Sequence, residues 1–224
     1  MSANFQTLAD KIAVLIAERE RTWPAGRLAK NAAERQDLID RFDPAQIVQP
    51  GEGLGSFTLL PVEGGELKLE TLVEEGPAVL LFFRFGGCPA CSIALPHYDL
   101  HLRPALERAN VSLLAVSPQL PERLNAFREQ LGLKIPIASD PDNRLARHLG
   151  LTFVPSPLPE GPPPQGWIGD VTGTGTWELP QPAVVVLDRH AKVSSVMVSP
   201  DWLKRPEADD VLQLVAEVST AEPT

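Results

Sequence analysis

The sequence predicts an α/β fold with a helical N-terminal extension, and three observations support this prediction. Apolar residues spaced three or four apart mark two amphipathic helices within residues 1–48. A continuous apolar run at residues 78–85, AVLLFFRF, is typical of a strand that is buried on both faces. From residue 56 onward, strand and helix patterns alternate, which indicates right-handed βαβ units and a largely parallel sheet.

Composition limits the classes of function. The chain has 224 residues, of which 43% are hydrophobic, enough to bury the core of one domain with an appendage. Its 20 Lys and Arg residues against 29 Asp and Glu give a net charge of −9, which argues against nucleic-acid and anionic-membrane partners. No apolar run reaches the roughly 20 residues of a membrane span, and the N-terminus lacks the basic start of a secretory signal. We therefore expect a cytoplasmic protein.

Residues 1–48 are expected to form the helical extension, and residues 49–224 the main domain. The first helix is predicted from about residue 4 to 21 and the second from about 28 to 42, before a linker that contains two prolines. The apolar stripe of the first helix predicts packing onto its own domain, with a homodimer interface as the alternative. This stripe consists of Phe5, Leu8, Ile12 and Leu15.

The main domain shows seven strand patterns and four helix patterns. The strands are expected at residues 56–60, 66–69, 78–85, 111–116, 136–139, 183–187 and 193–198. The helices are expected at residues 89–110, 121–132, 140–150 and 206–218. The last two strands flank a short turn and predict an antiparallel hairpin. Asp140 and Gly150 fit the two caps of the third helix.

Residues 155–182 interrupt this alternation. They are rich in proline and glycine and predict an irregular excursion of 28 residues. Loops of this length are often lids or partner surfaces, and a plain surface insertion is the other interpretation.

The chemistry-bearing motif is the only cysteine pair, Cys88 and Cys91, which follows the buried strand through two glycines into the first turn of a helix. Unpaired backbone N–H groups and the helix dipole favour a thiolate at this position. We therefore expect Cys88, at the exposed start of the helix, to attack, and Cys91, one turn further in, to resolve. Pro89 suits the first turn of the helix, because the backbone N–H that proline lacks would have no intrahelical partner there. Such a pair needs no metal or organic cofactor.

Two other interpretations of the cysteines stay open. A Cys-x-x-Cys pair is also common in zinc sites, where His97 and His101 could complete four ligands. Six residues separate Cys91 from His97, which places the imidazole about 240° around the helix from the sulfurs. The histidines are then solvent-facing or partly packed side chains. Two inert, buried cysteines are the remaining alternative.

Arg84, four residues before Cys88, also has two interpretations. Its guanidinium could reach the thiolate or a bound oxyanion if the strand geometry allows it. Alternatively, it leaves the edge of the sheet and pairs with a carboxylate.

Most of residues 50–218 resembles one branch of the thioredoxin superfamily. The resemblance rests on FFRFGGCPAC, SDPDNRLARHLGL, GTWELPQPAVVVLDRHAKV and SPDWLKRPEADDVLQL, which occur in the order expected of the peroxiredoxin-like branch of the alkyl hydroperoxide reductase/thiol-specific antioxidant family. It implies a thioredoxin-like fold, with a central mixed sheet flanked by helices and a proline kink at Pro96.

The resemblance also implies two supporting residues. Pro182 matches the proline that packs against the active cysteines, and its bond to Gln181 is expected to be cis. Arg205, which ends the Asp-Trp-x-x-Arg element that starts at Asp201, matches a second cation near the site.

The implied activity is the reduction of hydroperoxides by Cys88 and Cys91, with an external dithiol such as a thioredoxin or glutaredoxin system as reductant. Three positions depart from the family pattern. Leu81 and Phe85 replace the proline and the hydroxyl residue of the peroxide pocket, and Gly87 replaces a tryptophan. A thiol–disulfide oxidoreductase acting on protein disulfides therefore stays an alternative, and a non-catalytic binding module is the second.

Overall fold

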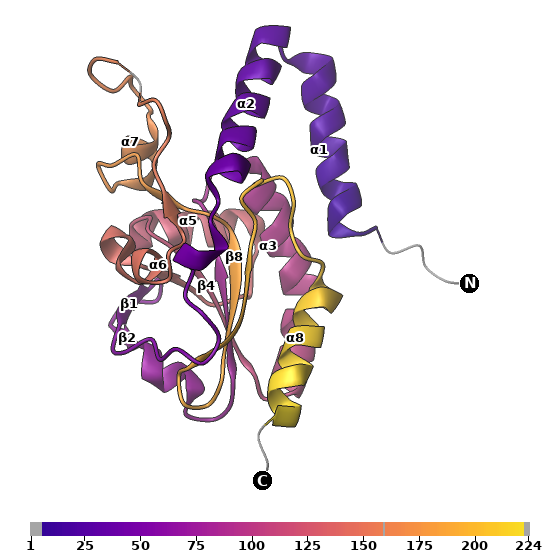
Figure 1. The fold of residues 1–224 in the computed structure, drawn as a ribbon, viewed down its shortest axis with the longest axis vertical. Coiled ribbons are helices and arrows are strands. Elements are labelled where there is room, and N and C mark those ends of the chain that lie inside the picture. The colour runs from indigo at the N-terminus through magenta and orange to yellow at the C-terminus, as the bar shows by residue number, and fades with distance from the viewer. Residues whose placement is uncertain (1–5, 159, 222–224) are drawn as a thin grey trace.

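The computed structural model describes residues 6–158 and 160–221 and has the α/β architecture that the sequence predicts (Figure 1). Seven strands form one sheet in the order β2-β1-β5-β4-β3-β8-β9. These strands are β1 (Thr58–Pro61), β2 (Leu67–Lys68), β3 (Ala78–Phe82), β4 (Ser112–Ser117), β5 (Ile137–Ser139), β8 (Ala183–Leu187) and β9 (Val193–Val198). The short strands β6 (Thr152–Phe153) and β7 (Leu179–Pro180) form a separate pair.

The sheet is mixed, as the family resemblance implies, and less parallel than the alternation of elements predicts. Within the described part of the chain, the parallel pairs are β3 with β4 and β4 with β5, and the other strand pairs are antiparallel. The hairpin of β8 and β9 is antiparallel, as predicted, and it lies antiparallel to β3 because the excursion after β6 reverses the chain. β1 is antiparallel to both of its neighbours.

Helices cover both faces of the sheet. The helices are α1 (Leu8–Thr22), α2 (Ala25–Arg41), α3 (Pro89–His101), α4 (Arg103–Arg108), α5 (Pro121–Leu131), α6 (Arg144–His148), α7 (Ile168–Thr172) and α8 (Ala208–Ala221). Three short 3₁₀ helices are η1 (Pro44–Gln46), η2 (Leu69–Val73) and η3 (Pro141–Asn143). Among the described residues, no helix is long and apolar enough to cross a membrane.

Side chains of β3 alternate between two cores, as expected for a strand buried on both faces. Val79 and Leu81 join one core with side chains of α3, α5 and α8. Leu80 and Phe82 join the other core with side chains of η2 and α6. The end of β3 is therefore fixed from both sides, and it is this end that leads into the cysteine pair.

Two predicted helices are interrupted. The helix expected at residues 89–110 divides into α3 and α4, because Pro104 has no N–H to continue the hydrogen-bond ladder. The helix expected at 140–150 begins as η3, because Asp142 and Asn143 adopt φ of 58° and 53°. The Asp140 carboxylate instead accepts from the N–H groups of α6, at 2.9 and 2.8 Å.

The N-terminal extension is an α1–α2 hairpin at one end of the molecule (Figure 1). The predicted start of its first helix at residue 4 lies outside the described residues. Thr7 begins α1 with a capping box that involves Asp10. Leu8 and Ile12 are buried in the same core as α3, so the apolar stripe packs onto its own domain.

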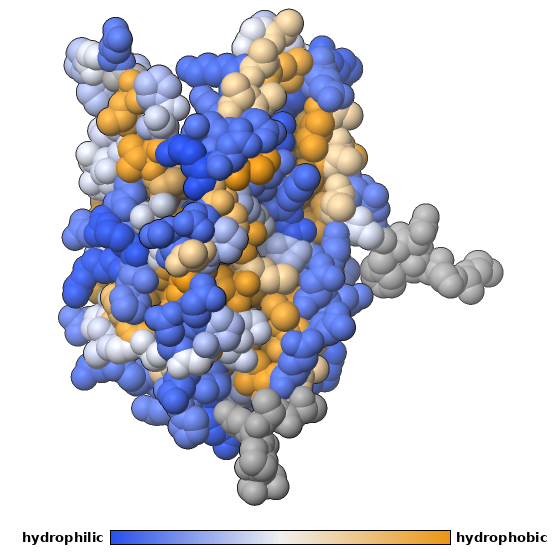
Figure 2. All heavy atoms as spheres, in the orientation of Figure 1, coloured by the Kyte–Doolittle hydropathy of each residue, from blue (hydrophilic) through white to orange (hydrophobic). Residues whose placement is uncertain are grey.

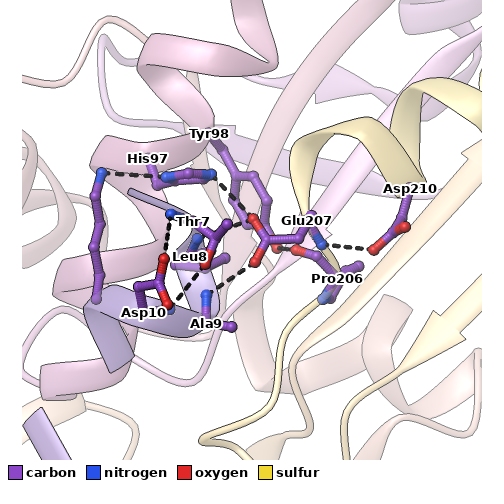
Figure 3. Close-up of polar contacts among 10 residues, drawn as sticks. Thr7, Leu8, Ala9, Asp10, His97, Tyr98, Pro206, Glu207 and Asp210 are labelled. Carbon is purple, nitrogen blue, oxygen red and sulfur yellow. Dashed lines mark hydrogen bonds and ion pairs between the residues drawn. The ribbon is translucent and has the colours of Figure 1, made fainter. Parts of the chain in front are cut away.

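Polar contacts fasten the start of α1 to the main domain (Figure 3). The Glu207 carboxylate accepts from the N–H groups of Leu8 and Ala9, each at 2.9 Å. His97 lies 3.5 Å from the same carboxylate and 3.2 Å from the Lys11 amine. Burial, helped by the Lys11 and His101 charges, lowers the pKa of His97 and favours the neutral imidazole, in which Nδ1 can accept from Lys11.

His97 is therefore buried, at 5% exposure, and not the solvent-facing or partly packed side chain that the sequence suggests. The helix periodicity places it correctly on the face opposite the sulfurs. The unexpected element is α1, which covers this face from a distant part of the sequence. The same cluster fixes the loop before α8, because Tyr98 donates to the Pro206 carbonyl at 2.7 Å.

Apolar side chains also face outward on the hairpin. Figure 2 shows hydrophobic surface along α1 between hydrophilic patches. Val14 on α1 is 60% exposed and Ile39 on α2 is 40% exposed. A homodimer contact through this surface stays a prediction.

Candidate active site

The junction between β3 and α3 is built by a tight turn. The N–H of Gly86 donates to the Gln119 side chain at 2.7 Å, and the N–H of Cys88 donates to the Phe85 carbonyl at 3.2 Å. Cys88 is the N-cap of α3, and Pro89 occupies the first turn, as predicted. The turn therefore delivers Cys88 to the positive end of the helix dipole.

Close packing explains why glycine occupies position 86. A Cβ at this position would lie 2.5 Å from Cγ of Phe127. We expect Gly86→Ala to lower the free energy of unfolding by about 1–3 kcal/mol through overpacking, measured by urea denaturation. Gly26→Ala in α2, where a Cβ meets nothing within 4 Å, is the control and should leave stability unchanged or slightly raised. Equal losses in both variants would contradict this explanation.

Cys88 and Cys91 are both free thiols and both buried, at 3% and 1% exposure. The expectation that Cys88 lies at an exposed helix start is therefore wrong. The Cys88 side chain lies in a core that also contains Leu8 of α1 and Trp202, from segments distant in sequence, although its neighbours Gly87 and Pro89 are exposed. Gln119 links the turn before Cys88 to α7 by donating to the Val171 carbonyl at 3.0 Å.

The two sulfurs differ in their acidity. A hydrogen bond from Cys91, assisted by the charges of Arg84 and Arg205, lowers the pKa of Cys88 to about 5 against the opposing effect of burial. Burial and the hydrogen bond to Cys88 raise the pKa of Cys91 well above its ordinary value. At neutral pH the pair is therefore a thiolate at Cys88 and a thiol at Cys91, the division that an attacking and a resolving cysteine require.

This division predicts a titration. The thiolate absorbance of the reduced protein should rise with a midpoint near the pKa of about 5. Cys91→Ala should move the midpoint upward, because the largest stabilising contact of the thiolate is lost. Cys88→Ser is the control and should lack this step. A wild-type midpoint near the ordinary thiol value of about 8.5 would contradict the assignment.

Two arginines flank the pair. The Arg84 guanidinium lies 4.2 Å from the ring centre of Trp202, and among the described residues no carboxylate pairs with it. Nη2 of Arg205 lies 3.7 Å from Sγ of Cys91. The charges of Arg84 and Arg205 both lower the pKa of Cys88. That the two arginines support the reactive sulfur stays a prediction.

Two site arginines were outside the predicted set. Arg19 on α1 is only 9% exposed, and its charge interacts with that of Cys88. Arg35 on α2 contacts both Asp201 carboxylate oxygens, at 2.9 and 3.0 Å. The sequence contains a pattern that could have identified Arg19. It lies four residues after Leu15 and so falls on the same helix face as the stripe of Leu8, Ile12 and Leu15.

Pro182 lies beside Cys91 and Arg205 in the lining of one small cavity. The predicted cis bond from Gln181 to Pro182 is wrong, since Ser156–Pro157 is the cis bond that the described residues contain. Gln181 and Pro182 connect β7 to β8. There the Gln181 N–H donates to Leu151, and the Pro182 carbonyl accepts from Ser199, both at 2.7 Å.

The zinc interpretation requires ligands that the fold does not assemble. Across residues 6–158 and 160–221, no three His, Cys, Asp or Glu side chains are grouped to hold a metal ion. His97 is instead engaged by Lys11 and Glu207, on the face of α3 that α1 and α8 cover.

The comparison with known families decides the relationship. The model of the AhpC/TSA family matches residues 50–196, more than half of the chain. The chain belongs to the AhpC/TSA family. In two strains of Mycobacterium tuberculosis, a protein named as a peroxiredoxin is 29% identical over 97 residues, which cover 43% of this chain and 60% of the relative. The match thus spans less than two thirds of these relatives.

Solved structures share the AhpC/TSA fold. Peroxidoxin BcpB of Mycobacterium tuberculosis has a TM-score of 0.58 and 21% identity, covering 76% of this chain and 98% of its own. Peroxiredoxin 6 of Arenicola marina has a TM-score of 0.63 and 18% identity, covering 78% and 76%. A Bacteroides thetaiotaomicron protein described as a disulfide isomerase has a TM-score of 0.53 and 17% identity, covering 77% and 91%.

The positions before Cys88 that depart from the expected family pattern differ in exposure. Leu81 is buried in β3, and Phe85, where the resemblance implies a hydroxyl residue, is half-buried. A Cβ at Gly87 would lie 3.0 Å from the Phe85 ring, so a tryptophan there would displace Phe85. The Arg84 guanidinium lies 5.8 Å from the Phe85 ring centre, so the segment before Cys88 carries an aromatic ring and a cation close together.

Proposed function

We propose that the protein is a thiol peroxidase that reduces hydroperoxides through Cys88 and Cys91. The observation that carries the proposal is the unequal acidity of the two sulfurs, with the pKa of Cys88 lowered to about 5 and that of Cys91 raised. Membership of the AhpC/TSA family supports the same chemistry.

The reaction balances without a bound cofactor. The Cys88 thiolate attacks the terminal peroxide oxygen, the O–O bond breaks, and the alcohol or water leaves with a proton, so Cys88 becomes a sulfenic acid. Cys91 then attacks the Cys88 sulfur, a disulfide forms and water leaves. An external dithiol returns the two electrons. Arg84 and Arg205 stabilise the thiolate and the negative charge that develops on the leaving oxygen.

A thiol–disulfide oxidoreductase is the second candidate, and one observation favours it. Leu81 and Phe85 replace the proline and the hydroxyl residue of a typical peroxide pocket. In this alternative, Cys88 attacks a protein disulfide and Cys91 releases the mixed disulfide. A binding module that keeps the fold without catalysis would need neither step.

Two assays separate these functions. Consumption of hydrogen peroxide or an organic hydroperoxide, with a dithiol as reductant, supports the peroxidase. Reduction of an insulin-type disulfide without peroxide consumption replaces it with the oxidoreductase. If neither assay responds and the Cys88 pKa is ordinary, the binding module replaces both. The partners proposed are a thioredoxin or glutaredoxin system in a reducing cytoplasm, and a second copy of the chain through the apolar surface of α1.

A further inference from the structure

The N-terminal hairpin brings arginines to the neighbourhood of Cys88. Arg19 comes from α1, Arg35 from α2 and Arg84 from the segment after β3. The charges of Arg35, Arg27 and Arg84, together with the Cys88 sulfur, act on the Arg19 guanidinium. Segments that are far apart in the sequence therefore place cationic groups in one region beside the reactive sulfur.

This region has few carboxylates. Asp201 accepts from Nη1 of Arg35, and its Oδ1 also accepts from the N–H of Leu203 at 3.0 Å. Among the described residues, no other carboxylate pairs with Arg19, Arg35 or Arg84. The excess of cations is local, because the whole chain has a net charge of −9.

Each of these three arginines has a buried nitrogen without a hydrogen-bond partner among the described residues. The atoms are Nη1 of Arg19, Nε of Arg35 and Nε of Arg84. Buried donors without partners are unfavourable, and a buried cation without an anion is more so. Burial is the main cause that lowers the pKa of Arg19, and the Cys88 sulfur is the group that opposes it. The Cys88 thiolate and the Asp201 carboxylate balance two of the three arginine charges, and one further anion would balance the third.

We propose that Arg19, Arg35 and Arg84 bind the carboxylate of a small organic substrate whose reactive group meets Cys88. Planar guanidinium groups match a carboxylate, and the burial of Arg19, which is 9% exposed, strengthens the contact. This inference takes the reaction from the proposed function and adds that the substrate carries a negative charge. The carboxylate belongs either to the hydroperoxide or to the thiol that reduces Cys88.

The first test does not depend on peroxide chemistry. Cys91→Ser leaves Cys88 as the sole thiol, and its alkylation by anionic iodoacetate is compared with that by neutral iodoacetamide. Relative to the same ratio for a free thiol such as glutathione, we expect Cys88 to favour iodoacetate at least about tenfold. Arg19→Met should remove most of this preference, whereas Arg21→Met, at an exposed position of the same helix, should not.

A folding defect is separated from a binding defect by Arg19→Lys and by thermal unfolding of each variant. Lysine keeps the charge but loses the guanidinium geometry, so an intermediate preference is expected. A Cys88 ratio equal to that of the free thiol would overturn the proposal. An equal effect of Arg19→Met and Arg21→Met would also overturn it.

The second test identifies the source of the carboxylate. Cumene hydroperoxide is compared with its para-carboxylate derivative, and mercaptoethanol with mercaptopropionate. If the protein prefers the anionic member of one pair and Arg19→Met removes this preference, the carboxylate belongs to the oxidant or to the reductant, whichever pair shows it. If neither pair shows a preference, the substrate assignment is wrong. If the protein turns over peroxide but shows no preference for a carboxylate, the proposed carboxylate site is wrong and the proposed peroxidase stands. If Cys88 prefers iodoacetate but the protein turns over no peroxide, the proposed peroxidase is wrong and the carboxylate site stands.

Discussion

Replacing Cys88 by serine is expected to abolish peroxide reduction, with a loss of more than about a thousandfold in the rate of peroxide consumption. The serine hydroxyl is not ionised near neutral pH, whereas the pKa of Cys88 is about 5. No other described cysteine can replace it, because the pKa of Cys91 is raised well above its ordinary value and its sulfur stays a thiol at neutral pH. The measurement is stopped-flow consumption of hydrogen peroxide and of an organic hydroperoxide.

Cys91→Ser is the matched control. Serine keeps a hydroxyl that can donate to the Cys88 sulfur, so the first step should survive and consume about one equivalent of peroxide per protein. Recycling by a dithiol should slow, because the intramolecular disulfide cannot form. If Cys91→Ser and not Cys88→Ser abolishes the first step, the two roles are reversed. If both variants turn over normally, the proposed peroxidase is wrong.

The reactive pair is predictable from sequence because its signal is local. A buried strand, two glycines and a proline around Cys88 suffice to place the sulfur at a helix N-terminus, and the structure has this arrangement. The burial of Cys88 is not local. It depends on distant segments such as α1 and the segment around Trp202, which share its core and which nothing in the flanking sequence indicates. Arg19 shows an intermediate case, since periodicity marks its face of α1 but not the element that this face covers.

The same distinction applies to the fold. The strands β3, β4 and β8 are predictable because runs of apolar residues mark burial on both faces. Their pairing is not, because the direction of β8 beside β3 depends on how the chain returns through residues 155–182. The Gln181–Pro182 bond differs from the family expectation, and its neighbouring backbone groups hydrogen-bond to Leu151 and Ser199, which lie on other segments.

Replacing Arg205 by methionine is expected to slow the reaction of Cys88 with peroxide by roughly 10–100-fold. Nη2 of Arg205 lies 3.7 Å from Sγ of Cys91, and the Arg205 charge lowers the pKa of both sulfurs. Its Nε and Nη1 are buried without hydrogen-bond partners among the described residues. These donors are free to face the charge that develops as the O–O bond breaks, a role that methionine cannot supply.

Ionisation alone cannot account for a loss of this size. If Arg205→Met raised the pKa of Cys88 from about 5 to about 6, roughly 90% of the thiol would still be ionised at pH 7. A tenfold or greater decrease measured by stopped flow at that pH would therefore reflect lost stabilisation of the transition state. Lys204→Met, at the exposed neighbouring position, is the control and should react as the wild type does. A decrease that disappears once the thiolate fraction is corrected would assign Arg205 to thiolate stabilisation alone.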